Sequence, residues 1–211
     1  MANILYLHGF ASGPQSNKAR FFATRFSRIG ATLHCPDLSE GDFAGLTLTK
    51  QLKFIDRLAQ ELEPAMIVGS SLGGYLAAIY ASLHPERARK LVLMAPAFGF
   101  PRGWEDQLGK DKMAAWRENG SVEIYHYAEG GQRSLGYQFY EDALWFDQFP
   151  DVSQPTLIFH GKLDQDVSPG LSVRFAVGKP NVQLELMDSG HALGDVLDEM
   201  WQGAADFYQT A

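Results

Sequence analysis

Six short apolar runs constrain the fold of this chain more than any other feature. Most are uniformly apolar and bounded by Gly, Pro or Asp, and they occupy residues 4–7, 32–35, 66–68, 91–94, 157–159 and 182–187. Half-exposed strands would alternate apolar and polar residues instead. Runs this short and this apolar are typical of strands buried on both faces of a parallel sheet.

Segments with helical spacing separate several of these runs. Apolar residues recur three or four positions apart at Phe22/Phe26/Ile29, Leu48/Leu52/Ile55/Leu62 and Leu72/Leu76/Ile79/Leu83. A last stripe, from Leu193 to Phe207, predicts a C-terminal helix packed on the sheet. We therefore expect an α/β fold, with a mostly parallel sheet of six to seven strands and helices on both faces.

Residues 98–154 break this rhythm, because they are rich in aromatic side chains and contain several glycines. The segment is too short to support a core of its own. We expect a single domain, 1–211, with 98–154 as an insertion after the fourth strand. The insertion is either a satellite core over the sheet edge or a lid, and the lid is favoured because loops after central strands reach the site in open α/β sheets.

Charge and composition exclude several classes of protein. The 18 Lys and Arg against 25 Asp and Glu give a net charge of −7, without a basic run that would bind nucleic acid. Cys35 is the single cysteine, and the N-terminal sequence lacks the features of a signal peptide, so we expect a cytoplasmic protein. No apolar stretch has the length of about 18 residues that a membrane span needs.

The strongest local motif is Gly69-Ser70-Ser71-Leu72-Gly73, a G-x-S-x-G between a predicted strand and a predicted helix. That context fits a sharp turn that exposes a nucleophilic serine. The turn places Ser71 at a helix N-terminus, where the Leu72 N–H would donate to a developing oxyanion. A second donor, the Phe10 N–H, would come from the glycine-rich loop after the first strand.

A serine nucleophile needs a base and a residue that orients the base. His191 lies between the last predicted strand and the last predicted helix, and Asp164 follows the fifth predicted strand. The order Ser, Asp, His matches the order that this motif requires. Asp166 is the competing acid.

The other histidines have simpler explanations. We expect His8 and His160 to shape the loops at strand ends, and His84 and His126 to face solvent or lie in loops. No spacing of His, Cys and Asp resembles a metal site, and no phosphate-binding motif is present, so we expect neither a metal nor a cofactor.

The stretches Tyr6-Leu7-His8-Gly9-Phe10-Ala11-Ser12-Gly13-Pro14 and Gly69-Ser70-Ser71-Leu72-Gly73-Gly74-Tyr75 resemble the small bacterial YqiA/YcfP-like esterases of the α/β-hydrolase superfamily. Ser16, Lys18 and Ala19 extend the likeness. The resemblance implies a compact fold without the first two antiparallel strands of larger members. It also implies ester hydrolysis with Ser71, Asp164 and His191 as the triad. The insertion looks longer than in the most compact relatives, so their pocket shape does not carry over.

The sequence thus predicts a serine hydrolase that cleaves a small-molecule acyl ester through an acyl-enzyme. A thioesterase, amidase or peptidase with the same triad remains an alternative, because the attack and the oxyanion chemistry are shared. A non-catalytic binding protein on the same scaffold is the alternative from another class.

Overall fold

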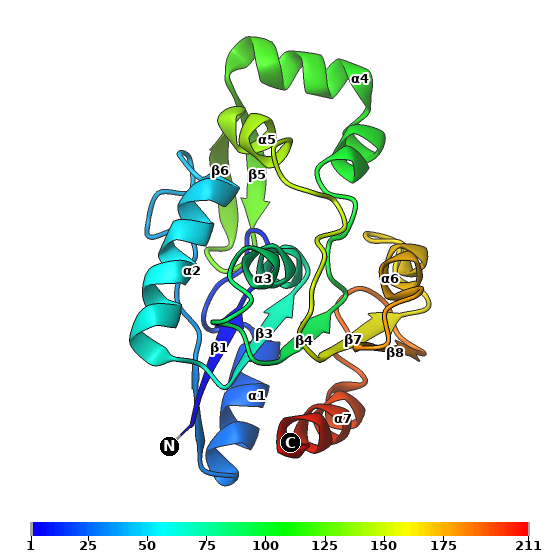
Figure 1. Ribbon diagram of the computed structural model, residues 1–211. Coiled ribbons are helices and arrows are strands. Elements are labelled where there is room, and N and C mark those ends of the chain that lie inside the picture. The colour runs from blue at the N-terminus through cyan, green and yellow to red at the C-terminus, as the bar shows by residue number, and fades with distance from the viewer. Residues whose placement is uncertain (1, 211) are drawn as a thin grey trace.

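The computed structural model describes residues 2–210, and its centre is a six-stranded sheet (Figure 1). The strands are β1 (Ala2–Leu7), β2 (Ala31–His34), β3 (Met66–Ser70), β4 (Leu91–Met94), β7 (Thr156–Gly161) and β8 (Val182–Met187). Their order is β2-β1-β3-β4-β7-β8, and every neighbouring pair is parallel. The prediction of a mostly parallel sheet, with a strand at each apolar run, is confirmed.

Helices cover both faces of this sheet (Figure 1). One face carries α1 (Asn17–Arg28) and α7 (Leu197–Gln209), and the other carries α2 (Leu48–Leu62), α3 (Leu72–Leu83) and α6 (Pro169–Ala176). The burial predicted for the C-terminal apolar stripe is correct, but the helix itself begins later than predicted, at Leu197. Leu193 is fully buried, yet its φ of +53° places it in the loop before α7.

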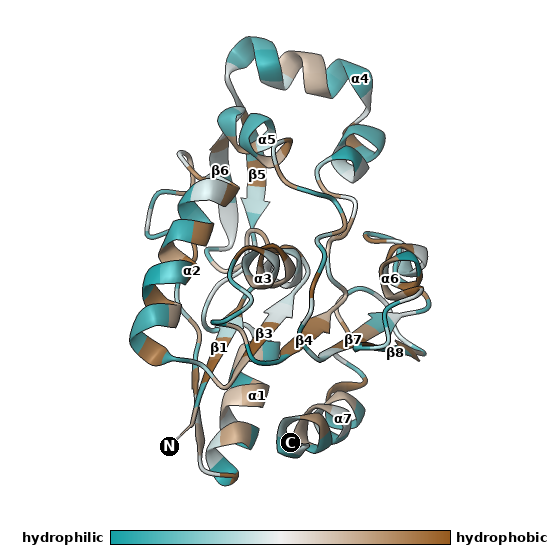
Figure 2. Ribbon diagram, viewed as in Figure 1, coloured by the Kyte–Doolittle hydropathy of each residue, from teal (hydrophilic) through white to brown (hydrophobic). Residues whose placement is uncertain are grey.

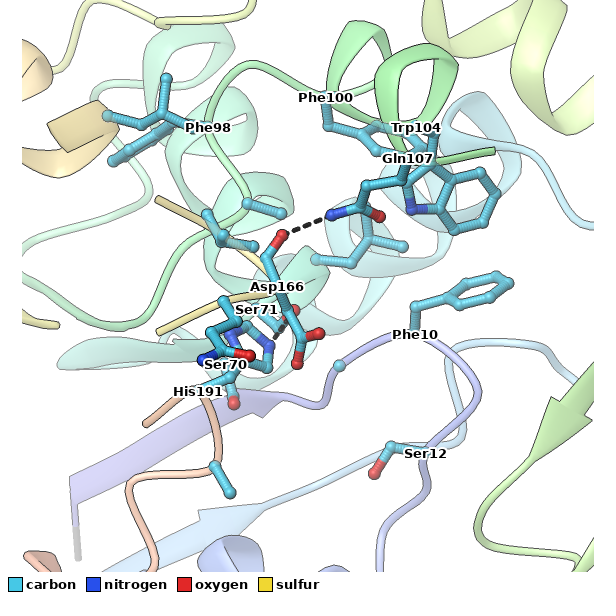
Figure 3. Close-up of a pocket in the computed structure, with 18 of the residues that line it drawn as sticks. Phe10, Ser12, Ser70, Ser71, Phe98, Phe100, Trp104, Gln107, Asp166 and His191 are labelled. Atoms are coloured by element: carbon cyan, nitrogen blue, oxygen red, sulfur yellow. Dashed lines mark hydrogen bonds between the residues drawn. The ribbon is translucent and has the colours of Figure 1, made fainter. Parts of the chain in front are cut away.

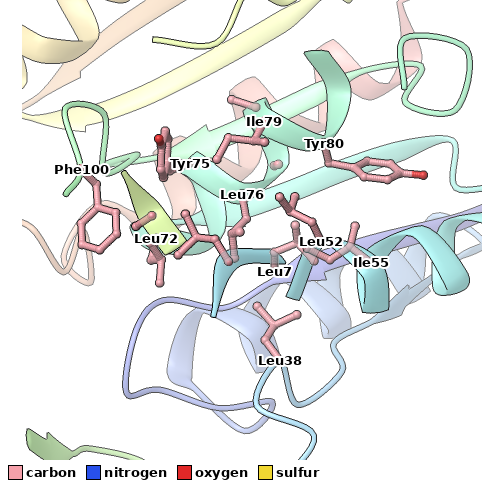
Figure 4. Packing of buried hydrophobic residues seen from close by; sticks show 14 of the residues in the cluster. Leu7, Leu38, Leu52, Ile55, Leu72, Tyr75, Leu76, Ile79, Tyr80 and Phe100 are labelled. Atoms are coloured by element: carbon pink, nitrogen blue, oxygen red, sulfur yellow. The ribbon is translucent and has the colours of Figure 1, made fainter. Parts of the chain in front are cut away.

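The side chains of the central strands alternate between two apolar layers, as the pleat requires. Leu5 and Ile67 pack in the layer with α2 and α3, whereas Ile4 and Met66 pack in the layer with α1 and α7. Figure 4 shows the first of these layers, with side chains of α2 and α3 meeting those of β1. In Figure 2 the ribbon of β4 is apolar in colour, in line with its complete burial.

The segment between β4 and β7 folds as α4 (Arg102–Asn119), β5 (Ser121–His126), β6 (Gly131–Gly136) and α5 (Gln138–Ala143). Strands β5 and β6 form an antiparallel pair that the sequence did not predict. The aromatic side chains of this segment divide between two environments. Trp116 and Phe139 are buried in the layer with α2 and α3, whereas Trp145 is 87% exposed.

His126 corrects another expectation, because it ends β5 as a buried residue against the ring of Phe43. In the described part of the chain, no helix is both long enough and apolar enough to cross a membrane.

The strand order identifies the edge of the sheet where a ligand would bind. From β1 the chain moves outward to β2 and then back past β1 to β3, so the direction of winding reverses between β1 and β3. Ligands of open α/β sheets bind beside the carboxyl ends of the strands at such a reversal. The loops after β1, β3, β7 and β8 all lie at this edge, because the strands are parallel.

Candidate active site

The turn after β3 holds Ser71 in a strained conformation. Its φ of +53° and ψ of −119° are rare for a residue with a side chain. Backbone hydrogen bonds fix this conformation: the Ser71 N–H donates to Met94 O at 2.9 Å, and the Ala97 N–H donates to Ser71 O at 3.1 Å. The neighbouring strand β4 and the loop after it therefore impose the turn.

The two glycines of the motif are explained by close backbone contacts. A Cβ added to Gly73 would lie 2.1 Å from the carbonyl oxygen of Leu7, at the end of β1. A Cβ added to Gly69 would lie 2.4 Å from the carbonyl oxygen of Gly73. Any side chain at these positions would push α3 away from the sheet. The G-x-S-x-G pattern is thus required by the packing of α3 against β1 and β3.

The structure brings Ser71, His191 and Asp164 together. His191 Nε2 lies 3.0 Å from Ser71 Oγ, and His191 Nδ1 lies 2.7 Å from Asp164 Oδ2. Figure 3 shows the imidazole directed at the serine. With the proton on Nδ1, the imidazole donates to Asp164, and its Nε2 lone pair faces the Ser71 hydroxyl.

The Asp164 carboxylate has donors on both oxygens. Its Oδ1 accepts the N–H groups of Asp166 and Val167, each at 2.9 Å, while Oδ2 faces His191. Burial by itself raises the pKa of the Asp164 carboxyl, but hydrogen bonds from His160, His191 and Val167 outweigh it and hold the pKa well below its usual value. The Asp164 side chain is therefore a carboxylate at neutral pH.

Asp166, the competing acid, lines the cavity but does not hydrogen-bond to His191. Its carbonyl oxygen instead accepts a hydrogen bond from Gln107 of α4 at 2.6 Å (Figure 3). Asp164, Asp166 and His191 also form a group whose potential ligand atoms lie within 4.8 Å of one another. The hydrogen bonds on Asp164 use the oxygen atoms that a metal ion would need.

His160 contacts the acid of this arrangement, which the sequence did not predict. Its side chain is fully buried, and its Nε2 lies 3.2 Å from Asp164 Oδ2 and 2.9 Å from Val167 O. The Ser172 hydroxyl, 2.8 Å from Nδ1, completes its hydrogen bonding. His160 shapes its loop as predicted, and it also contacts the same Asp164 oxygen, Oδ2, that His191 contacts.

The loop after β1 lies against the Ser71 turn. A Cβ added to Gly9 would be 3.4 Å from both Ser70 O and Ser71 Cβ, so the two loops are in contact. Across residues 2–210, neither the Phe10 N–H nor the Leu72 N–H donates to a backbone carbonyl. Both N–H groups are therefore available to a ligand.

His8 has the structural role that the sequence predicted. Its Nε2 accepts the Leu38 N–H at 3.1 Å, while Nδ1 lies 2.9 Å from Gly9 O. Burial lowers the pKa of this imidazole, although the hydrogen bond to Gly9 opposes the effect. A neutral ring satisfies both contacts, and it fixes the loop that carries Phe10.

A cavity of about 810 Å³ lies over Ser71 and has two unlike ends. The aromatic end is lined by Phe98, Phe100, Trp104 and Leu171, and the polar end is lined by Tyr6, Ser12, Ser16 and Lys18. In Figure 3 the labelled residues of the aromatic end lie on one side of Ser71 and His191, and Ser12 lies on the other. Asp106 and Asp166 also line the cavity.

A parallel sheet with this order and a strained serine turn after β3 define an α/β-hydrolase fold, and solved structures agree. Mouse α/β hydrolase domain-containing protein 10 superposes with a TM-score of 0.79 at 20% identity, covering 97% of this chain and 88% of that one. Est1E from Butyrivibrio proteoclasticus, solved with ferulic acid bound, gives a TM-score of 0.79 at 18% identity. The match covers 100% of this chain and 90% of the Est1E chain.

The family follows from the sequence comparison. Residues 3–208 match the model of the uncharacterised protein family UPF0227, and the chain belongs to that family. This confirms the resemblance to the YqiA/YcfP-like proteins of the α/β-hydrolase superfamily. A poly(3-hydroxyalkanoate) depolymerase from Ectopseudomonas oleovorans is 27% identical over 152 residues. The match covers 59% of this chain but only 53% of the depolymerase, so this chain spans about half of that relative.

Proposed function

We propose that this protein is a serine hydrolase that cleaves carboxylic esters, with Ser71 as nucleophile, His191 as base and Asp164 as the residue that orients the base. One observation carries the proposal: the continuous chain of hydrogen bonds from Ser71 Oγ through His191 to Asp164, at 3.0 and 2.7 Å. A serine hydroxyl is a weak nucleophile until such a base removes its proton.

The chemistry proceeds in two halves. His191 takes the Ser71 proton as the hydroxyl oxygen attacks the ester carbonyl, and the N–H groups of Phe10 and Leu72 stabilise the oxyanion. His191 then protonates the leaving alcohol, and an acyl-enzyme remains on Ser71. Water, activated by His191, attacks this acyl-enzyme and releases the acid. Asp164 stays ionised throughout and stabilises the imidazolium.

The aromatic end of the cavity favours an apolar or aromatic acyl group, with the segment 98–154 acting as a lid over it. Poly(3-hydroxyalkanoate) is a polyester, so the name of the depolymerase relative agrees with ester cleavage. Thioesters and amides share the attack step, and a panel of acyl esters, thioesters and amides separates these alternatives. The cytoplasmic location and the single domain stay predictions from the sequence.

Replacement of the two adjacent serines tests the proposal. Ser71→Ala should lower kcat for 4-nitrophenyl butyrate by about 10⁴-fold or more, because the nucleophile is lost. Ser70→Ala is the matched control, because Ser70 precedes the turn and does not bond to His191. Its effect should stay below about tenfold. Circular dichroism checks that both variants fold, and activity retained by folded Ser71→Ala would contradict the proposal.

A further inference from the structure

Lys18 lies at the polar end of the cavity, and its charge has no role in the proposed chemistry of Ser71, His191 and Asp164. Lys18 Nζ donates to the backbone carbonyl of Ala192 at 2.9 Å. Within residues 2–210 no carboxylate lies within ion-pair distance of this ammonium group. An ammonium group has three donors, so two of them remain for a ligand. Lys18 therefore lines the cavity with no acidic side chain in contact with its ammonium group among the described residues.

The surroundings of Lys18 favour an anion. Burial lowers the pKa of Lys18 to about 8, although the negative charge of Asp164 opposes this. At neutral pH the amine is still mostly protonated, and a bound anion would offset the cost of burying it.

The hydroxyl of Tyr6 is a second polar group at this end of the cavity. Tyr6 is fully buried and lines the same cavity. Its hydroxyl lies near the hydroxyls of Ser16 and Ser70 but, within the described residues, has no partner with hydrogen-bond distance and angle. Burial raises the pKa of this hydroxyl, so it remains protonated and can donate. A buried donor left unpaired is costly, which points to a ligand that completes its hydrogen bonding.

The N-terminal end of α1 adds to the positive potential. Its N-cap residue, Ser16, and Lys18 both line the cavity, so the first turn of this helix faces the polar end. The first N–H groups of a helix have no intrahelical partner and favour negative charge.

The position of Lys18 also decides which part of the substrate carries the anion. His191 must give its proton to the leaving oxygen, so the leaving group passes over the imidazole. Lys18 binds the carbonyl of Ala192, the residue directly after His191. The opposite end of the cavity is lined by aromatic side chains and by Asp106, which would repel an anion. Asp166 also lines the cavity on this side, with a carboxylate oxygen within 4.8 Å of a His191 ring nitrogen. Among the described residues that line the cavity, Lys18 is the one Lys or Arg, so an anion on the leaving group would be bound there.

We propose that Lys18, together with the Tyr6 hydroxyl and the first turn of α1, forms a subsite for an anionic group on the leaving-group part of the substrate. This inference rests on the proposed hydrolase function and specifies its substrate class. The substrate would join an apolar or aromatic acyl group to an alcohol that carries a negative charge.

Two matched pairs of chromogenic esters test the subsite. The first pair is 3-butanoyloxy-4-nitrobenzoate and its neutral amide, 3-butanoyloxy-4-nitrobenzamide, which differ only in the charge of the leaving group. The second pair is 4-nitrophenyl succinate and 4-nitrophenyl butyrate, in which the charge lies on the acyl group. The wild-type protein should show a higher kcat/KM for the charged member of the first pair, mainly through KM, and should not favour the charged member of the second.

Lys18→Met removes the charge and keeps the length of the side chain. The ratio of kcat/KM between charged and neutral members of the first pair should then fall about tenfold or more, as the loss of a charge-assisted hydrogen bond predicts. Lys18→Arg should restore much of the ratio. Lys53→Met, which removes an exposed lysine of α2, is the control for net charge and should leave the ratio unchanged.

Three outcomes would overturn the inference. Wild-type protein that hydrolyses both members of the first pair equally would show a hydrolase without the anionic subsite. An equal fall for both members in Lys18→Met would show that Lys18 only supports the His191 loop. No hydrolysis of any ester by the wild type would overturn the proposed function, and the inference with it.

Discussion

The Asp164 carboxylate determines what the imidazole beside Ser71 can do. Two backbone N–H groups and the imidazoles of His160 and His191 surround its oxygens. The carboxylate selects the His191 tautomer with the proton on Nδ1, which leaves Nε2 free to accept the serine proton. A neutral amide in its place could present its NH₂ group to Nδ1 and stabilise the wrong tautomer.

Asp164→Asn should therefore lower kcat for 4-nitrophenyl butyrate by about 10⁴-fold while the protein stays folded. Asp166→Asn, the matched control two residues away, should change kcat by less than about tenfold, because Asp166 does not bond to His191. Steady-state kinetics on both variants is the measurement. Equal losses in the two variants would show that the acid has been assigned wrongly.

The contact between His160 and Asp164 could not be predicted from residue types. A histidine before a glycine at a strand end looked like a loop residue, and its bond to Val167 O agrees with that. Its contact with Asp164 depends on the path of the turn that follows β7, which folds residue 164 back beneath residue 160. The spacing of residues in the sequence does not predict the path of this turn.

Strands and helices were predictable where burial leaves a pattern. The central strands β3, β4 and β7 are fully buried because helices cover both of their faces, whereas the edge strand β8 exposes Gln183 and Glu185. Helices α1, α2 and α3 carry apolar stripes. The hairpin was missed because β5 alternates partly buried residues with exposed ones such as Glu123, and β6 has one large apolar residue, Leu135. The start of α7 was misplaced because Leu193 and Val196 are buried without being helical.

The contact between α3 and β1 leads to a prediction about stability. Gly73→Ala should destabilise the protein by about 1–3 kcal/mol or more, because a Cβ would lie 2.1 Å from Leu7 O with backbone on both sides. Gly103→Ala, in α4, is the control, because no atom lies within 4 Å of its added Cβ. It should change stability by less than about 0.5 kcal/mol or stabilise the helix slightly. Urea unfolding measures both, and equal stability of the two variants would contradict this packing.

Helix α4 should be the most mobile wall of the cavity. Trp116 is its one buried residue, and Gly109, with a φ of +76° and ψ of 162°, interrupts the helix. By contrast, residues 72–81 of α3 are all buried. Amide hydrogen exchange in residues 102–115 should therefore be at least about 100-fold faster than in the centre of α3. Similar protection of the two helices would contradict the proposal that this segment acts as a lid.

The parallel sheet is what joins residues that are far apart in the chain. Ser71 and His191 are 120 positions apart, and Asp164 lies 27 positions before His191. The sequence could identify these residues because each follows an apolar run, and parallel strands bring such positions to one edge. The distances, the second histidine and the two unlike ends of the cavity required the packed structure, because they depend on how the loops fold against one another.

Covalent labelling shows directly whether Ser71 is the activated nucleophile. The account predicts that a fluorophosphonate probe forms one adduct per chain, that peptide mass spectrometry places it on Ser71, and that His191→Ala slows its formation greatly because the base is gone. A folded wild-type protein that forms no adduct, or that is labelled on Ser70 or elsewhere, would contradict the account.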